Sequence, residues 1–341
     1  MGVWLIVIWA AVLLATLGGA AYVAYRFSDT LRTLPAQWKN LTPFEGAIAV
    51  LGAMVFYVFD YLRLYALLLV MKVKLGVRRG VEVIILSEFA SVLTPTAELH
   101  MPVSVYALTR MDVPPEKAIA AVSTKTMYGI MWVCVMGLSS LFAFDGVKLP
   151  DLVSRNLPYL AIPIVIIATV FFSLTLFSKS IRAWTLRHEK TPYTGRVGGL
   201  KKKAVSWIGR SAGAIATIGK STHPMHLLAH AANVGYIVAY CFVGWWLSYS
   251  MNIHLSAAAA FTIFSNSLMI DYLAPVPGSI GITEFVTAYM IDPNLAPPSI
   301  VAAVLLRILC KYAVLLPGSF VAINLLRREG LKMFSDNRQQ A

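Results

Sequence analysis

Charged residues are scarce in this sequence. Asp, Glu, Lys and Arg make up 13% of its 341 residues, whereas the hydrophobic types reach 58%. A soluble domain carries about 25% charged residues, and no water-soluble fold could hide so much apolar surface. The apolar residues also form runs of about twenty or more, the length that crosses roughly 30 Å of hydrocarbon. The sequence therefore excludes a soluble globular protein and predicts an all-α polytopic membrane protein.

Cysteine and catalytic motifs are also lacking. The three cysteines all fall in apolar segments and their number is odd, so a disulfide framework or zinc site is not implied. The sequence has no Walker-type loop, dinucleotide fingerprint or nucleophile elbow. His226 and His230 are four residues apart but have no third ligand at helical spacing, so we interpret them as an interfacial pair. We therefore expect no cofactor, no metal and no enzymatic activity of this chain.

Six apolar segments are long enough to span a membrane: about 3–25, 44–71, 117–143, 158–178, 224–250 and 299–326. Two further stretches, about 80–109 and 255–290, are interrupted by Thr94-Pro95-Thr96 and by Ala274-Pro275-Val276-Pro277-Gly278. Proline removes an amide donor and clashes with the preceding turn. A broken backbone at membrane depth must be buried in protein or line a wet cavity. The sequence therefore predicts six spans plus two re-entrant broken-helix hairpins.

The formal net charge of +13 resides in the loops, so the positive-inside rule explains it better than nucleic-acid binding does. Basic residues concentrate in 72–79, 179–220 and 327–338, which we expect to be cytoplasmic together with the C-terminus. The 144–157 and 291–298 connections are poor in basic residues and should lie outside. The 26–43 loop is ambiguous, so the orientation of the N-terminus stays open.

An internal repeat divides the chain into two halves. At an offset of 182 residues Pro95 falls on Pro277, Pro115 on Pro297, and Lys125 on Arg307. The loop charges give the halves opposite orientations, as in many secondary transporters that bind substrate near the midplane. Identity elsewhere is low, so chance alignment is the alternative to an inverted repeat.

The predicted organisation has five parts. Residues 1–43 form the first span and its loop, 44–178 the first repeat half plus a connecting span, and 179–222 a basic cytoplasmic linker. Residues 223–326 form the second repeat half and 327–341 a cytoplasmic tail. The linker contains either an amphipathic helix on an anionic leaflet or a solvated segment that enforces topology.

Three of the cations within predicted spans stand out, because a charge there costs about 2.5–3.5 kcal/mol. They are Lys125, Arg307 and Lys311, the last two sharing one helical face. We expect them to hold an anionic group, with phosphate the natural guest. The helices that restart after Pro95 and after Pro277-Gly278 would direct free amides toward the same anion. The alternative is that the cations neutralise buried carboxylates.

Five carboxylates accompany these cations: Asp60, Glu88, Glu98, Asp271 and Glu284. Glu98 follows the first break by three residues, and Glu284 follows the second by seven. Such groups can couple or gate transport by binding a proton or cation. They can equally pair with the three cations, or with Arg63 in the case of Asp60.

The two breaks resemble a known family. The segment Pro275-Val276-Pro277-Gly278-Ser279-Ile280-Gly281-Ile282-Thr283-Glu284 is similar to the Pro-x-Pro-Gly-Gly-x-Gly-x-x-Glu motif of the transmembrane flippase-like region of lysylphosphatidylglycerol synthases. Leu93-Thr94-Pro95-Thr96-Ala97-Glu98 is the weaker counterpart. Ser279 and Ala97 depart from glycines of the family, and Lys125 stands where arginine is usual.

The resemblance implies a flippase that moves an anionic phospholipid or a polyprenyl-phosphate-linked lipid between leaflets of a prokaryotic plasma membrane. No aminoacyl-transferase domain follows within the sequence, so lipid lysinylation by this chain alone is not expected. One alternative is a secondary transporter of a small anionic solute. Another is a non-transporting membrane subunit of a lipid-modifying transferase. The expected partners are an anionic lipid and the membrane, without nucleic acid, and homo-oligomerisation is left open.

Overall fold

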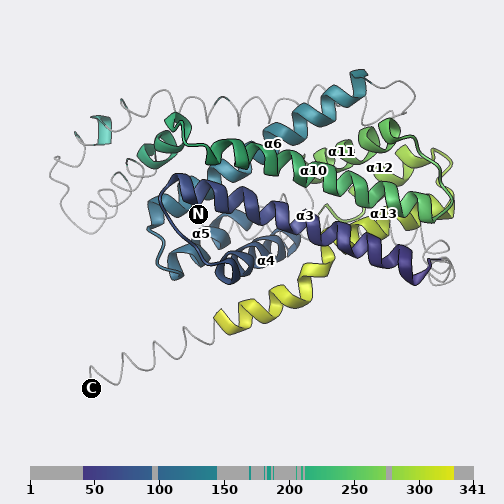
Figure 1. Cartoon of the computed structure of the whole chain (residues 1–341), viewed down its shortest axis with the longest axis horizontal. Coiled ribbons are helices and arrows are strands. Elements are labelled where there is room, and N and C mark those ends of the chain that lie inside the picture. The colour runs from purple at the N-terminus through teal and green to yellow at the C-terminus, as the bar shows by residue number, and fades with distance from the viewer. Residues whose placement is uncertain are drawn as a thin grey trace, which may run out of the picture.

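The computed structural model describes residues 41–93, 99–143, 212–273 and 279–325, with a few single positions between 169 and 209. Every regular element in these ranges is a helix (Figure 1). This result confirms the predicted all-α class. Two of the predicted spans, 3–25 and 158–178, and the loop, linker and tail that were predicted around them lie largely outside the described residues.

The described chain includes eight labelled α-helices and one 3₁₀ turn. They are α3 (Pro43–Val70), α4 (Val77–Leu93), α5 (His100–Arg110), α6 (Pro115–Ala143), α10 (Met225–Ser250), α11 (Ala257–Leu273), α12 (Ile282–Ile291), α13 (Pro297–Cys310) and η1 (Tyr312–Val314). The chain is helical again over 315–325.

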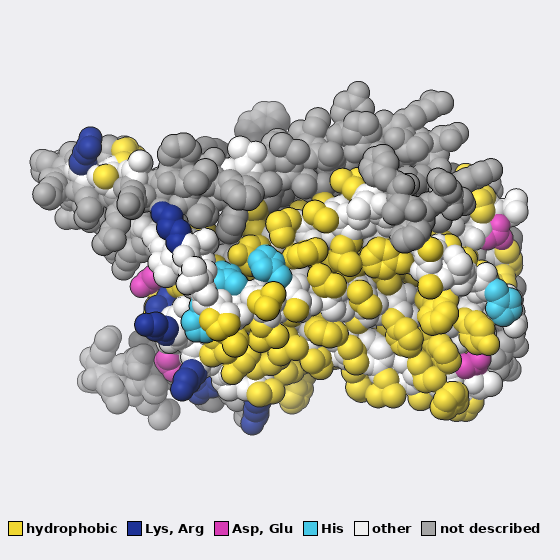
Figure 2. All heavy atoms as spheres, turned by 45° about the horizontal axis from the view of Figure 1, so that its top comes forward, with side chains coloured by type: hydrophobic (Ala, Val, Ile, Leu, Met, Phe, Trp, Pro, Cys, Tyr) yellow, Lys and Arg dark blue, Asp and Glu magenta, His cyan; other side chains and the backbone are white. Residues whose placement is uncertain are grey.

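Four helical segments are long and apolar enough to cross a membrane. They are Pro43–Val70, Pro115–Ser140, Met225–Ser250 and Pro297–Leu325. These segments correspond to the predicted spans at about 44–71, 117–143, 224–250 and 299–326. The protein is therefore a multi-pass membrane protein. Its surface agrees, because hydrophobic side chains cover much of the face in Figure 2 while Lys and Arg gather at one end.

The start of α3 is fixed by its own sequence. The Thr42 hydroxyl accepts a hydrogen bond from the Glu45 amide at 3.3 Å, and the Glu45 carboxylate accepts from the Thr42 amide at 2.8 Å. Pro43 occupies the first turn, where its missing N–H costs nothing. This capping box satisfies two amide donors that the helix end leaves free.

Helices α3 and α10 run side by side through the middle of the molecule (Figure 1). A Cβ built on Gly52 would come within 2.8 Å of Val243 Cγ2, so the small residue permits the close approach of the two helices. The rings of Phe56 and Tyr236 stack nearby with centroids 4.2 Å apart. This helix pair forms the core to which the shorter helices attach.

Two pairs of short helices pack on this core. In each pair the members contact each other, α4 with α5 and α11 with α12, and the pairs lie toward opposite ends of the molecule (Figure 1). The breaks at 94–98 and 274–278, with Pro95, Glu98, Pro277 and Gly278, lie outside the described residues. The helices end and restart around both breaks, as the helix-breaking residues predicted.

The order of helices recurs along the chain. Pro43 and Met225, which begin α3 and α10, are 182 residues apart, as are the first residues of α5 and α12 and of α6 and α13. Helices α4 and α11 each have 17 residues. The recurrence of helix starts supports the repeat, whose inverted orientation stays a prediction.

The last span contains a break that the sequence prediction missed. Helix α13 ends at Cys310, Lys311 leaves the helical region with φ −131° and ψ −55°, and the 3₁₀ turn follows. Pro317 gives the physical reason, because it cannot donate to the carbonyl of Ala313 and its ring crowds that carbonyl. The following helix bends away from α13 (Figure 1), so the break falls beside the buried cations Arg307 and Lys311.

Candidate functional site

Buried charge is concentrated in one region of the described protein. The buried charged residues are Asp60, Arg63, Glu88, Lys125, Asp271, Arg307 and Lys311. The Glu284 side chain joins them at 13% exposure. Four carboxylates therefore meet four cations, and the formal charge of the network sums to zero. A balanced set is what a low-dielectric interior tolerates, since an unpaired charge there is costly.

The first ion cluster joins α3 to α6 and α10. Asp60 pairs with Arg63 one turn further along α3, and its other carboxylate oxygen accepts from Lys125 Nζ at 2.8 Å. Arg63 also donates to Asn233 Oδ1 at 3.2 Å and lies over the Tyr236 ring at 3.7 Å. One carboxylate thus serves two cations.

The second ion cluster joins α4, α11 and α13. Arg307 Nη1 lies 2.7 Å from Asp271 Oδ1, and Lys311 Nζ lies 3.4 Å from the other oxygen of the same carboxylate. Lys311 also donates to Glu88 Oε2 at 3.2 Å. Lys311 sits at the break that ends α13, so the irregular backbone is anchored by charges from two other helices.

Glu284 completes the second cluster from the first turn of α12. Its Oε2 accepts from the Gly281 amide at 2.8 Å, and its Oε1 accepts from the Tyr312 hydroxyl at 2.7 Å. Arg307 Nε is 3.6 Å from Oε1. Gly281 has φ 83°, a left-handed conformation that glycine adopts freely. The glycine therefore lets α12 restart with its amide directed at the carboxylate.

The two ion clusters approach each other between α6 and α11. A Cβ built on Gly129 would lie 3.1 Å from Arg63 Nη1 and 3.6 Å from Tyr272 Oη, so Tyr272 reaches the first cluster while its neighbour Asp271 belongs to the second. Arg63 Nε and Thr124 Oγ1 are buried and make no hydrogen bond within the part of the chain that is described. Arg63 thus retains an unused donor in the first cluster.

Seven of the predicted site residues meet in these clusters. They are Asp60, Glu88, Lys125, Asp271, Glu284, Arg307 and Lys311, all of them in ion pairs. The alternative that the cations neutralise buried carboxylates therefore describes the observed pairing, and a role in substrate binding stays a proposal. The repeat-related Lys125 and Arg307 pair with carboxylates that are not repeat-related, Asp60 on α3 and Asp271 on α11.

The prediction missed several partners. Asn233, Tyr236, Gly281 and Tyr312 all contact the charged groups, but neutral residues carry no charge signal in a sequence. The Pro317-Gly318 dipeptide near the end of the last apolar run could have indicated the break beside Lys311.

Ser279 shows how the second break is held. Its φ of 54° lies in the left-handed region that favours glycine, the residue found there in the motif that the segment resembles. The serine hydroxyl donates to the Asp271 carbonyl at 2.7 Å. That carbonyl is among the last four of α11, which have no partner within the helix. The hydroxyl thus offsets the cost of the strained backbone.

The histidine pair lies between α6 and α10. His230 Nδ1 accepts from Trp132 Nε1 at 3.0 Å, and its ring stacks on Tyr128 with centroids 4.4 Å apart. His226 lies near the Tyr128 hydroxyl, with 3.5 Å between that oxygen and Nδ1. Both imidazoles therefore take part in interhelical packing.

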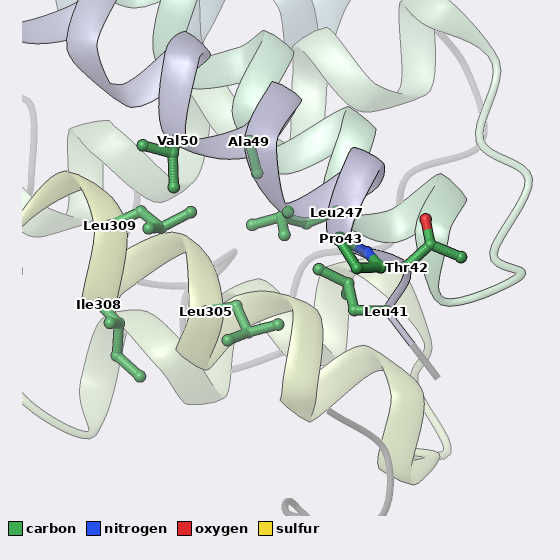
Figure 3. Close-up of a pocket in the computed structure, with 10 residues that line it drawn as sticks. Leu41, Thr42, Pro43, Ala49, Val50, Leu247, Leu305, Ile308 and Leu309 are labelled. Carbon is green, nitrogen blue, oxygen red and sulfur yellow. The ribbon is translucent and has the colours of Figure 1, made fainter. Parts of the chain in front are cut away.

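An apolar cavity of about 300 Å³ opens beside α13, between the start of α3 and the end of α10 (Figure 3). Its walls include Leu41, Val50, Leu247, Leu305 and Leu309, and Thr42 supplies the main polar side chain. Leu305 and Leu309 flank Arg307 along α13, so this helix carries the apolar wall and the buried guanidinium.

Comparison with known proteins identifies one family. The sequence model of the lysylphosphatidylglycerol synthase TM region matches residues 3–318, and a search of curated proteins finds no match.

Proposed function

Because the chain belongs to the family of the lysylphosphatidylglycerol synthase TM region, we propose that it is a flippase of the plasma membrane. Its substrate in this proposal is an anionic phospholipid or a polyprenyl-phosphate-linked lipid, which it moves between leaflets. The observation that carries the proposal is the neutral network of four carboxylates and four cations inside a bundle with an apolar surface.

A paired network suits transient anion binding. Arg307 and Lys311 already hold carboxylates, so a lipid phosphate can take the place of a carboxylate without leaving either cation unpaired. The guanidinium of Arg307 can donate to a phosphate oxygen, and Lys311 adds a point charge. The spare donor at Arg63 Nε offers a further hydrogen bond in the first cluster.

The backbone arrangement supports alternating access. The helix pairs α4–α5 and α11–α12 lie toward opposite ends of the molecule and α13 breaks between Arg307 and the 3₁₀ turn (Figure 1). In inverted-repeat transporters, broken helices of this kind form the substrate site near the midplane. The exposed basic residues at 72–79 favour a cytoplasmic location for the loop between α3 and α4. The basic residues at 327–338 of the sequence favour the same side for the C-terminus.

Apolar surface favours a lipid over a small soluble anion. Leu51, Met54 and Val58 of α3 are more than half exposed, and the apolar cavity lies against the helix that carries Arg307. A lipid needs such a path for its chains, whereas a soluble anion would need a polar one. In this proposal the headgroup meets the ion clusters while the hydrocarbon stays in apolar surroundings.

Native mass spectrometry of the protein, gently extracted from its own membrane, tests the proposal. We expect a phosphate-bearing lipid on the wild type and its depletion in Arg307→Ala and in Lys125→Ala. Arg78→Ala is the matched control, because Arg78 is an exposed arginine whose partner is Glu82 on the same helix. Far-UV circular dichroism checks that each variant is folded.

Lipid that is absent from the wild type, or retained equally in both site variants, would overturn the proposal. A soluble anion in its place would favour the solute transporter. An obligate partner that co-purifies and carries an active site would favour the transferase subunit.

A further inference from the structure

The carboxylate of Glu284 occupies a site built from donors of three separate elements. The Gly281 amide donates at 2.8 Å, the Tyr312 hydroxyl at 2.7 Å, and the Arg307 guanidinium lies 3.6 Å away. These groups come from the start of α12, from η1 and from α13. Thr283 Oγ1, in the same first turn of α12, is buried and has no hydrogen bond among the described residues. Donors of this kind gather where an anion is to be bound.

Arg307 does not depend on Glu284 for its position. Its short contact is with Asp271, at 2.7 Å, and at 3.6 Å its distance to Glu284 exceeds that of a hydrogen bond. If Glu284 left, the guanidinium would still be paired and still point into the same space.

Glu284 is also the most exposed charged side chain of the second cluster. Its side chain is 13% exposed, whereas the Arg307 and Asp271 side chains are 1% and 4% exposed. It belongs to a ten-residue helix that begins just after the second break, and not to a long span. Its withdrawal therefore needs no opening of the α3–α10 core.

We propose that the Gly281 amide, Tyr312 hydroxyl and Arg307 guanidinium form a phosphate-binding site, and that Glu284 is its internal anion, which a lipid phosphate displaces. The inference rests on the proposed function and names the group of the substrate that this site takes. A phosphate diester offers two non-bridging oxygens that share one negative charge, one for the guanidinium and one for the amide and hydroxyl. In the resting protein, Glu284 thereby satisfies the Gly281 amide and the Tyr312 hydroxyl and keeps the buried network neutral.

The test compares Glu284→Gln with the wild type, both purified in a nonionic detergent. Glutamine keeps the length of the side chain and an oxygen that can accept from Gly281 or Tyr312, but it removes the competing charge. We expect dihexanoyl-phosphatidylglycerol to bind about tenfold more tightly to Glu284→Gln in isothermal titration calorimetry. Glu82→Gln is the matched control, since Glu82 is a helix glutamate whose arginine partner is largely exposed, and it should bind as the wild type does.

A second variant covers the case in which Glu284→Gln does not fold. Glu284→Asp keeps the charge of the network but is one methylene shorter, so it cannot hold Gly281 and Tyr312 together. We expect phosphatidylglycerol to bind about threefold more tightly to it. In whichever Glu284 variant folds, we expect the Tyr312 hydroxyl to donate to the ligand in place of Glu284. Adding Tyr312→Phe removes this hydroxyl and should therefore abolish most of the gain in affinity.

The outcomes separate this inference from the proposed function. Wild-type binding of phosphatidylglycerol with unchanged or weaker binding by both Glu284 variants would overturn the internal-anion role and leave the flippase proposal standing. A lack of binding in the wild type and in both variants would overturn both proposals. Glycerol 1-phosphate provides the second arm: if it binds as tightly as the lipid, the site takes a free phosphate compound and not a lipid headgroup.

Discussion

Asp60 is the carboxylate that the two cations of the first cluster share, because Arg63 and Lys125 both pair with it. Removing this carboxylate would strand two buried cations, whereas removing Lys125 would leave Asp60 still paired. Breaking a buried ion pair from one side costs about 3–5 kcal/mol. The two partners therefore differ in how much stability each supports.

We predict that Asp60→Asn lowers the free energy of unfolding by about 3–5 kcal/mol, and that Lys125→Met lowers it by less, about 1–2 kcal/mol. Unfolding in mixed micelles by titration with sodium dodecyl sulfate measures both. Equal losses, or a greater loss in Lys125→Met, would contradict the assignment of Asp60 as the shared partner.

Ser279 allows a second prediction at the scale of one residue. Ser279→Ala keeps the strained φ of 54° but loses the bond to the Asp271 carbonyl, so we expect a loss of about 1–2 kcal/mol. Ser279→Gly loses the same bond but relieves strain of about 1 kcal/mol, so it should lie near the wild type. The same unfolding titration compares them. A glycine variant as unstable as the alanine variant would show that the strain is not relieved.

At the scale of helices, close packing depends on glycines of α10. A Cβ on Gly244 would lie 2.4 Å from Cδ1 of the fully buried Phe264 on α11. Gly244→Ala should therefore cost about 1–3 kcal/mol through overpacking, measured as a lower thermal midpoint in detergent. Gly213→Ala is the control, since among the described residues nothing beyond its own helix backbone and chain neighbours lies within 4 Å of its Cβ position, and it should leave the midpoint unchanged or raise it. A harmless Gly244→Ala would contradict the close packing of α10 on α11.

The helix positions were predictable because the sequence marks them locally. Apolar runs set the four spans, and prolines mark the starts of α3, α6 and α13. The break at Lys311 was missed since its cause, Pro317, lies within a run that is otherwise apolar. The choice of ion partners was also beyond reach, because Lys125 could pair with any of five carboxylates until packing placed Asp60 against it.

At the scale of the whole molecule, the loop charges predict which end is cytoplasmic. Lys74 and Asn294 are exposed in the loops before α4 and after α12. In a background without Cys134, Cys241 and Cys310, Lys74→Cys should react with a membrane-impermeant maleimide only after the cytoplasmic side is opened. Asn294→Cys should react in intact cells. Labelling of both positions from one side would contradict the topology with two re-entrant hairpins.

The proposed flippase activity can be measured as lipid movement between the leaflets of reconstituted vesicles. The assay follows fluorescent phosphatidylglycerol, with phosphatidylcholine for comparison and with and without a transmembrane proton gradient. Asp271→Asn/Arg307→Gln is the decisive variant, because it removes one charge of each sign and keeps the network neutral.

We predict that the wild type moves phosphatidylglycerol faster than protein-free vesicles do, and that the folded double variant is slower by about tenfold or more. Transport at the wild-type rate by the double variant, or no transport by the wild type under either condition, would contradict this prediction.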